Sequence, residues 1–409
     1  MGYSNIAEAP NMPSAAGAVL LAGGWLSFAV IANEVMIPSD FSLVLVALTI
    51  AEVIGRLLVT GWVSIDRETH LFSWSHSLAS IMLRWVAFVA MLGVLFAVAP
   101  MPLLIGQPIS MLYIAGASLA LSVSNLAAAQ RSALHQNRYN IFPLRMVFAA
   151  ALLWGLDEIS EIDAGLLLSA LLLLWLAVAV TLLQGLPSPF SEVGSPRQPQ
   201  LRKTVLAFGP ALLKVADILI LPCVLSPVPA AGYIGMRAGG LLTIFTLSSV
   251  QAATRERLKR NSAPSLAAEF AADAARLNLG LLLIGGGVSV GILVIQPYIT
   301  PHFSPFASGD VTVLLWILLG ALAPALLGAA PVLLSLTGHR REWALISFVG
   351  VLLLAALTYS LRISTPLGLA QVYAAVQLAT IACAALIIGR TRGVWPGLTA
   401  VLFRRIRLT

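Results

Sequence analysis

Charged side chains are scarce in this chain. Only 10% of its 409 residues are Asp, Glu, Lys or Arg, whereas 59% are hydrophobic. A soluble domain carries about 25% charged residues, so water cannot be the main solvent of this protein. Cysteine is rarer still. Cys223 and Cys383 lie in apolar runs without CxxC spacing, and the five histidines lack metal-ligand spacing. We therefore expect no disulfide, metal site, cofactor or catalytic residue.

Long apolar runs are what the chain has instead. A helix of about 20 residues crosses the hydrocarbon core of a bilayer, which is about 30 Å thick. The runs predict an all-α polytopic membrane protein with about twelve transmembrane helices. The expected spans are 13–33, 40–61, 77–98, 104–127, 141–156, 164–186, 205–226, 231–252, 277–297, 311–335, 343–361 and 368–389.

The loops between these spans differ in charge. Lys and Arg gather in every second loop and in the C-terminal tail, while the opposite loops hold essentially Arg362 alone as a cation. Their acids are Glu34, Asp40, Asp157, Glu158, Glu161, Asp163 and Asp310. The positive-inside rule then predicts that both termini lie in the cytoplasm. These loop residues also account for the net charge of +7, so we expect no binding of nucleic acid. Residues 1–13 contain no Lys or Arg, so we expect no signal peptide.

A polar stretch rich in Pro and Ser divides the chain near its middle. The expected parts are an N-terminal six-helix lobe at 1–190, a cytoplasmic linker at 191–203, a C-terminal six-helix lobe at 204–390 and a basic cytoplasmic tail at 391–409. Residues 265–276 are good helix formers and predict a short surface helix. The tail either lies on the inner leaflet or extends freely.

Three motifs in the second half carry a family resemblance. They are Ala216-Asp217-Ile-Leu-Ile-Leu followed by Ala230-Ala-Gly-Tyr-Ile-Gly-Met-Arg237, then Leu333-Leu-Ser-Leu-Thr-Gly-His-Arg340, then Leu361-Arg-Ile-Ser-Thr-Pro-Leu-Gly-Leu-Ala370. These resemble marks of the polysaccharide flippases, the O-antigen and exopolysaccharide exporters of the multidrug/oligosaccharidyl-lipid/polysaccharide (MOP) superfamily. The resemblance covers about residues 200–390 by motif and 15–186 by span pattern. It implies a MATE-like fold of two six-helix lobes.

Ionisable residues inside the expected spans are the best candidates for function. A charge at the bilayer centre costs about 2.5 to 3.5 kcal/mol, so each must be offset by a partner, water or a ligand. The set is Glu52, Arg56, Arg84, Arg145, Lys214, Asp217 and Arg237. Glu52 with Arg56, and Lys214 with Asp217, are spaced to pair along one helix face.

The cations of this set outnumber its acids, which suits an anionic headgroup. We expect Arg237, Lys214, Arg84, Arg56 and Arg145 to bind a pyrophosphate in a central cavity, because guanidinium groups bind phosphate oxygens bidentately. Arg237 is the first candidate, since no acid lies three or four positions away; snorkelling outward or pairing with Asp217 are its alternatives. Arg145 could equally snorkel to the headgroups. Glu52 and Asp217 either couple transport to an ion or are merely kept ionised by neighbouring cations.

The resemblance implies a transporter rather than an enzyme. Its substrate would be an undecaprenyl-pyrophosphate-linked oligosaccharide, flipped across the bacterial inner membrane by alternating access for polysaccharide synthesis. The expected partners are this substrate and membrane lipids, with a polysaccharide polymerase as a further candidate, and a monomer should suffice. The alternative is a cation-coupled drug antiporter of the same superfamily, whose cavity should be more acidic. A glycosyltransferase is disfavoured, because no loop is long enough for a catalytic domain.

Overall fold

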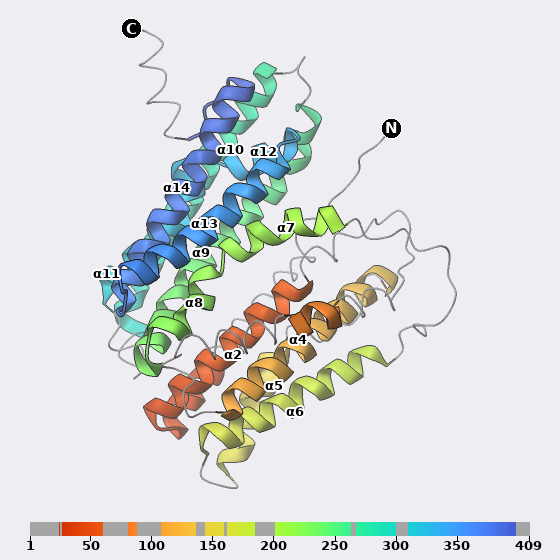
Figure 1. The fold of residues 1–409 in the computed structure, drawn as a ribbon, viewed down its shortest axis with the longest axis vertical. Coiled ribbons are helices and arrows are strands. Elements are labelled where there is room, and N and C mark those ends of the chain that lie inside the picture. The colour runs from red at the N-terminus through yellow and green to blue at the C-terminus, as the bar shows by residue number, and fades with distance from the viewer. Residues whose placement is uncertain are drawn as a thin grey trace. The chain divides into compact units, whose positions relative to one another are not determined.

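The protein is built of helices throughout its described part. The computed structural model describes residue 24 and residues 27–59, 81–87, 108–135, 144–158, 162–184, 201–262, 267–299 and 310–397. Within these ranges the regular elements are helices, without a strand (Figure 1). The all-α class expected from composition is confirmed.

The chain forms two compact units. An N-terminal unit comprises Met1–Phe208 and Ser226–Ala231, and a C-terminal unit comprises Gly209–Leu225 and Gly232–Thr409. The expected linker lies largely outside the described residues, so the lobe boundary at 191–203 stays a prediction.

Four helices with defined bounds make up most of the described N-terminal unit. They are α2 (Pro38–Val59), α4 (Pro108–His135), α5 (Arg145–Asp157) and α6 (Ala164–Leu183), and α4 packs against both α2 and α6. The two helices α2 and α4 meet closely at Gly55, where an added Cβ would lie 2.9 Å from the Cβ of Leu121. Ser122 on α4 donates a hydrogen bond to the Gly55 carbonyl at 3.3 Å. A small residue thus lets the two backbones approach, as is common in membranes.

The second half of the chain contains eight helices with defined bounds. They are α7 (Leu201–Leu213), α8 (Ala216–Val224), α9 (Pro227–Arg260), α10 (Ala267–Ile299), α11 (Val311–Leu326), α12 (Ala330–Leu336), α13 (Arg340–Ser360) and α14 (Pro366–Arg392). In the C-terminal unit, α14 packs against α11, α12 and α13, and α10 packs against α11. The expected surface helix at 265–276 is wrong as a separate element, because α10 runs unbroken from Ala267 into its apolar part.

Two expected spans each consist of two helices with a break between them. The segment predicted as 205–226 becomes α7 and α8, bent by 54°, and the segment predicted as 311–335 becomes α11 and α12, bent by 42°. Proline and glycine explain the second break: Pro324 lies inside α11, Gly328 has φ +86°, and a proline stands in the first turn of α12. Membrane proteins tolerate such breaks where neighbouring side chains satisfy the freed backbone groups.

The described helices are apolar and long enough for a multi-pass membrane protein. Seven could cross a bilayer by length and composition, or nine if each bent pair counts as one span. Much of the expected spans 13–33 and 77–98 lies outside the described residues. The number twelve therefore stays a prediction.

The start of the expected basic tail packs against the C-terminal unit. Gly393, at φ +68°, ends α14, and the chain then turns so that Pro396 is buried. Gly397, at φ +58°, meets the α11–α12 break: a Cβ on Gly397 would lie 2.4 Å from the Gly328 nitrogen, and a Cβ on Gly328 would lie 2.4 Å from the Cβ of Pro396. Residues 398–409 lie outside the described part.

Candidate functional site

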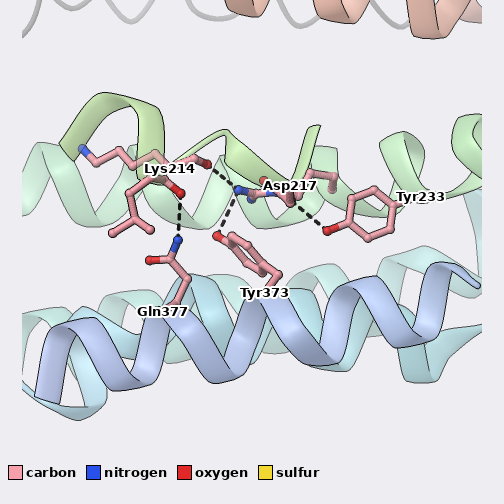
Figure 2. Close-up of polar contacts among 7 residues, drawn as sticks. Lys214, Asp217, Tyr233, Tyr373 and Gln377 are labelled. Atoms are coloured by element: carbon pink, nitrogen blue, oxygen red, sulfur yellow. Dashed lines mark hydrogen bonds and ion pairs between the residues drawn. The ribbon is translucent and has the colours of Figure 1, made fainter. Parts of the chain in front are cut away.

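A buried ion pair lies at the break between α7 and α8. Asp217, in the first turn of α8, accepts hydrogen bonds at its Oδ2 from the Arg237 Nε at 2.7 Å and the Tyr233 hydroxyl at 2.8 Å. Tyr233 and Arg237 both belong to α9, four residues apart, so one helix face presents both donors. The aspartate and arginine side chains are 0% and 1% exposed. Figure 2 shows Asp217 and Tyr233 pointing toward each other.

The guanidinium of Arg237 also reaches two other helices. Its Nη2 donates to the Lys214 backbone carbonyl at 2.8 Å and to the Tyr373 hydroxyl at 2.9 Å. The guanidinium carbon lies 4.5 Å from the centroid of the Tyr373 ring, which adds a cation–π contact. Arg237 thus ties α9 to the α7–α8 break and to α14.

These contacts complete the hydrogen bonding of the helix break. A helix end leaves carbonyl groups that need partners outside the helix. The Lys214 carbonyl accepts a hydrogen bond from Arg237. The Leu213 carbonyl accepts one from the side-chain amide of Gln377 on α14 at 3.0 Å (Figure 2). Two polar side chains therefore stabilise a bend that the α7 and α8 sequence alone would leave unsatisfied.

Two glycines make room for the cluster. A Cβ on Gly240 would lie 3.1 Å from the Arg237 Nη1 and 2.5 Å from the Cγ2 of Ile317. A Cβ on Gly320 of α11 would lie 2.6 Å from the Tyr373 ring. Larger residues at either position would displace the groups that hold Arg237.

The charges of this cluster balance within the described residues. One carboxylate faces one guanidinium, and both are buried. The Asp217 Oδ1 and the Arg237 Nη1 have no hydrogen-bond partner among the described side chains and backbone groups. Arg237 is thus held through its Nε and Nη2 by a carboxylate, a carbonyl and a hydroxyl, and its Nη1 is buried.

The expected pairing of Lys214 with Asp217 is not the one found. Asp217 pairs with Arg237, the alternative considered for that arginine, while Lys214 is exposed. The spacing of three residues produces a shared face only along an unbroken helix. The break after Leu213 removes that geometry.

A second ion-pair cluster lies in the N-terminal unit. Glu52 on α2 pairs with Arg56 at 2.9 Å, as its i,i+4 spacing predicts, and also with Arg145 at the start of α5. The side chain of Arg145 is 1% exposed and that of Glu52 is 11% exposed, whereas that of Arg56 is 44% exposed. One carboxylate therefore contacts two guanidinium groups.

The remaining predicted cation in this unit is Arg84. Its Nη1 donates to the Leu58 carbonyl of α2 at 3.1 Å, and the residue is half-buried. Four of the predicted residues, Glu52, Arg56, Arg84 and Arg145, thus lie in the N-terminal unit. The other three lie in the C-terminal unit, where Lys214 joins the cluster only through its carbonyl oxygen.

Sequence reasoning missed three members of the C-terminal cluster. Tyr233, Tyr373 and Gln377 are polar residues within apolar helices, and they were not singled out because none is charged. The signal was present: Tyr373 and Gln377 are four apart and share a face of α14. Among the described residues, no group of three or more His, Cys, Asp or Glu side chains is placed to hold a metal ion.

Comparison with known proteins identifies the fold. No family model matches the sequence, and no curated protein matches it. Among solved structures, the lipid II flippase MurJ in an inward closed conformation superimposes with a TM-score of 0.63 at 10% identity, over 92% of this chain and 87% of that one.

Two MATE structures superimpose as well. A proline-to-alanine mutant of a MATE protein matches with a TM-score of 0.53 at 14% identity, over 95% of this chain and 94% of that one. An outward-facing MATE multidrug resistance transporter of the MOP superfamily matches with a TM-score of 0.51 at 13% identity, over 98% of each chain. The chain is therefore a multi-pass membrane protein with the fold of the MOP superfamily transporters.

Proposed function

We propose that this protein is a flippase that moves undecaprenyl-pyrophosphate-linked oligosaccharides across the bacterial inner membrane by alternating access. The product would supply cell-surface or extracellular polysaccharide synthesis. This proposal keeps both termini in the cytoplasm, a monomer as the working form, and a polysaccharide polymerase as a neighbour in the membrane.

The observation that carries the proposal is the meeting of two guanidinium groups at Glu52 in the N-terminal unit. Arg145 is buried against this carboxylate, whereas the Arg56 side chain is 44% exposed. An anionic headgroup such as a pyrophosphate would bind guanidinium groups bidentately.

Lys214 is a second candidate for phosphate binding. It lies at the α7–α8 break and its side chain is exposed, whereas Arg237 is committed to Asp217. Discontinuous helices are a common place for substrate contacts in transporters. In our proposal Arg56 is the candidate headgroup contact of the N-terminal unit, where Arg145 and Arg84 contribute positive potential. Lys214 is the candidate contact of the C-terminal unit, where Arg237 holds the break in place.

The fold likeness supports a transporter of this kind. The lipid II flippase MurJ gives a higher TM-score than the two MATE structures, 0.63 against 0.53 and 0.51. At 10% to 14% identity this likeness concerns the fold, so the substrate rests on the charges.

A cation-coupled drug antiporter is the alternative. The likeness to the MATE structures favours it, and Glu52 and Asp217 are the buried carboxylates it would use. Both carboxylates are bound by arginine, which leaves little negative charge for a cationic drug. The charge balance therefore favours the flippase.

The test is headgroup translocation in proteoliposomes. A pyrophosphate-linked oligosaccharide is incorporated, and its appearance in the opposite leaflet is compared for the parent, Arg56→Gln and Lys214→Gln at matched protein levels. We expect each substitution to slow translocation about tenfold, because a hydrogen bond to a charged group contributes about 1.5 kcal/mol or more. Arg341→Gln, which removes an exposed cation at the start of α13, is the matched control and should translocate like the parent.

Two results would overturn the proposal. Equal translocation rates in the parent, Arg56→Gln and Lys214→Gln would show that these cations do not bind the headgroup. A parent that moves no oligosaccharide but exports a cationic dye against an ion gradient would establish the antiporter instead.

A further inference from the structure

Two arginines converge on one buried carboxylate where α9 ends and α10 begins. Asp273 of α10 is 6% exposed. Its Oδ1 lies 2.9 Å from the Nε of Arg257 on α9 and 3.4 Å from the Nη1 of Arg276 on α10. Its Oδ2 accepts the side-chain amide of Asn261 at 2.8 Å. We call Arg257, Asn261, Asp273 and Arg276 the α9–α10 clasp.

The clasp leaves much of both guanidinium groups in solvent. The side chain of Arg257 is 58% exposed and that of Arg276 is 68% exposed. Arg257 reaches the carboxylate through its Nε, and its two terminal nitrogens take no part in that contact. Asp273 balances only one of the two positive charges. A fixed carboxylate thus orients two arginines while leaving a net positive charge facing outward.

The position along the helices places the clasp at the membrane boundary. In α10 no ionisable residue occurs at 277–295, a run of about 19 residues that spans about 28 Å at the helical rise of 1.5 Å per residue. Arg276 immediately precedes this run. In α9 residues 238–254 lack ionisable side chains, and Arg257 follows shortly after. Since the hydrocarbon core is about 30 Å thick, both arginines lie at the level of the lipid headgroups.

We propose that the α9–α10 clasp binds the phosphate of an anionic membrane phospholipid. Arg257 and Arg276 contact the phosphate oxygens, a pairing that the planar guanidinium makes bidentately. Asp273 and Asn261 are positioning residues: they hold the arginines and do not touch the lipid. Anionic headgroups bind at such basic sites near helix ends on the cytoplasmic side, where the positive-inside rule places this loop. The lipid would be a specific structural partner, independent of the substrate.

The substitution Asp273→Asn distinguishes a phosphate site with oriented arginines from a surface that attracts anions by net charge alone. If only net charge mattered, Asp273→Asn would strengthen binding of an anionic lipid by removing a negative charge. If the carboxylate orients the arginines, the same substitution weakens binding although the protein becomes more positive. We expect weaker binding.

The experiment measures lipid binding to the full chain purified in detergent, by native mass spectrometry with phosphatidylglycerol. Phosphatidylcholine is the zwitterionic comparison, and inorganic phosphate is added as a competitor. We expect Arg257→Ala and Arg276→Ala each to weaken phosphatidylglycerol binding about fivefold, and the double variant about 25-fold, because each basic residue near a membrane surface contributes about 1 kcal/mol. Arg260→Ala removes the same charge from an exposed position of α9 outside the clasp and should bind like the parent.

Several outcomes would overturn this proposal. Equal loss in Arg260→Ala, or stronger binding in Asp273→Asn, would show a diffuse charge effect. Binding of phosphatidylcholine as tight as that of phosphatidylglycerol would exclude recognition of the anionic headgroup. Full competition by millimolar inorganic phosphate would identify a free-anion site instead. Binding is read directly, so failure of the proposed transport function would not affect the result.

Discussion

The ion-pair clusters at Asp217 and at Glu52 both place arginine against a carboxylate within apolar helices, but they differ in the number of arginines and in exposure. In the C-terminal unit, Asp217 and Arg237 are both buried, and each charge has its partner. In the N-terminal unit, Glu52 faces Arg56 and Arg145, and Arg56 is partly exposed. The first cluster is balanced and closed, which suits a structural role at the helix break. The second holds two cations around one carboxylate, which suits ligand binding.

This comparison corrects an inference from charge alone. In the sequence, Arg237 ranks first among the intramembrane cations as a candidate for an anionic ligand, because no acid lies three or four positions away. The geometry ranks them, because a guanidinium that is bound on several sides must lose those contacts before it binds anything else. Stability and transport should therefore respond to different arginines.

The largest effect is expected at the balanced cluster. Arg237→Ala leaves Asp217 as a buried, uncompensated charge, and breaking a buried pair costs about 3 to 5 kcal/mol. We expect a strong fall in the thermal unfolding temperature of the detergent-solubilised protein. The double variant Arg237→Met with Asp217→Asn removes both charges and should recover much of that loss. If Arg237→Ala unfolds like the parent, the pair is not structural and the contrast between the clusters fails.

A smaller loss should follow from crowding the same cluster. Gly320→Ala places a methyl group 2.6 Å from the Tyr373 ring, which packs on Arg237. Overpacking a well-packed region costs about 1 to 3 kcal/mol. Gly287→Ala on α10, where a Cβ meets nothing within 4 Å, is the matched control and should unfold at or above the parent temperature. Equal unfolding temperatures for both variants would indicate that the cluster tolerates displacement of Tyr373.

Arg56→Gln should change stability little. A partly exposed ion pair contributes about 0 to 1 kcal/mol, and Arg145 remains to pair with Glu52. The unfolding temperature should stay within about 2 °C of the parent's, although translocation falls. A large drop in unfolding temperature would mean that this arginine is structural too, which would erase the difference between the two clusters.

The smallest effect belongs to a carboxylate held by hydrogen bonds from Thr312. Asp310 precedes α11 and accepts hydrogen bonds from the backbone amide and hydroxyl of Thr312, which lower the pKa of this carboxyl below its ordinary value of 3.8. A lowered folded-state pKa contributes stability that is present above the ordinary value and is lost as the pH falls through the lowered one. Asp310→Asn should slightly flatten the acid limb of a plot of unfolding temperature against pH. Superimposable acid limbs would show that this cap contributes nothing.

Local features of the structure could be predicted from sequence. Apolar runs predicted the helical class, and the i,i+4 spacing of Glu52 and Arg56 predicted their pair, because both depend on residues close in the chain. The sequence offered the Arg237–Asp217 pair only as an alternative to phosphate binding by Arg237, because the two residues lie on different helices. Tyr373, which lies far along the chain from Arg237, could not be placed without the packing of α14.

The position of the α7–α8 break was the second feature that local sequence did not determine. Pro210 lies inside α7 and Pro222 inside α8, yet the bend falls at Lys214 and Val215, where neither residue is a proline. Its position depends on Arg237 and Gln377 from distant helices, which donate hydrogen bonds to the freed carbonyl groups. Hydrogen bonds from distant helices, rather than local helix propensity, therefore stabilise the bend that separates Lys214 from Asp217.

The contact between Gly328 and Gly397 has a practical consequence for anyone handling this protein. By composition the chain after α14 resembles a dispensable charged extension, an obvious place to shorten the protein or to attach a reporter. Its first residues instead fill the α11–α12 break backbone against backbone. A stop codon placed directly after Arg392 would remove part of the C-terminal unit, whereas one placed after Gly397 would spare every contact described at that break.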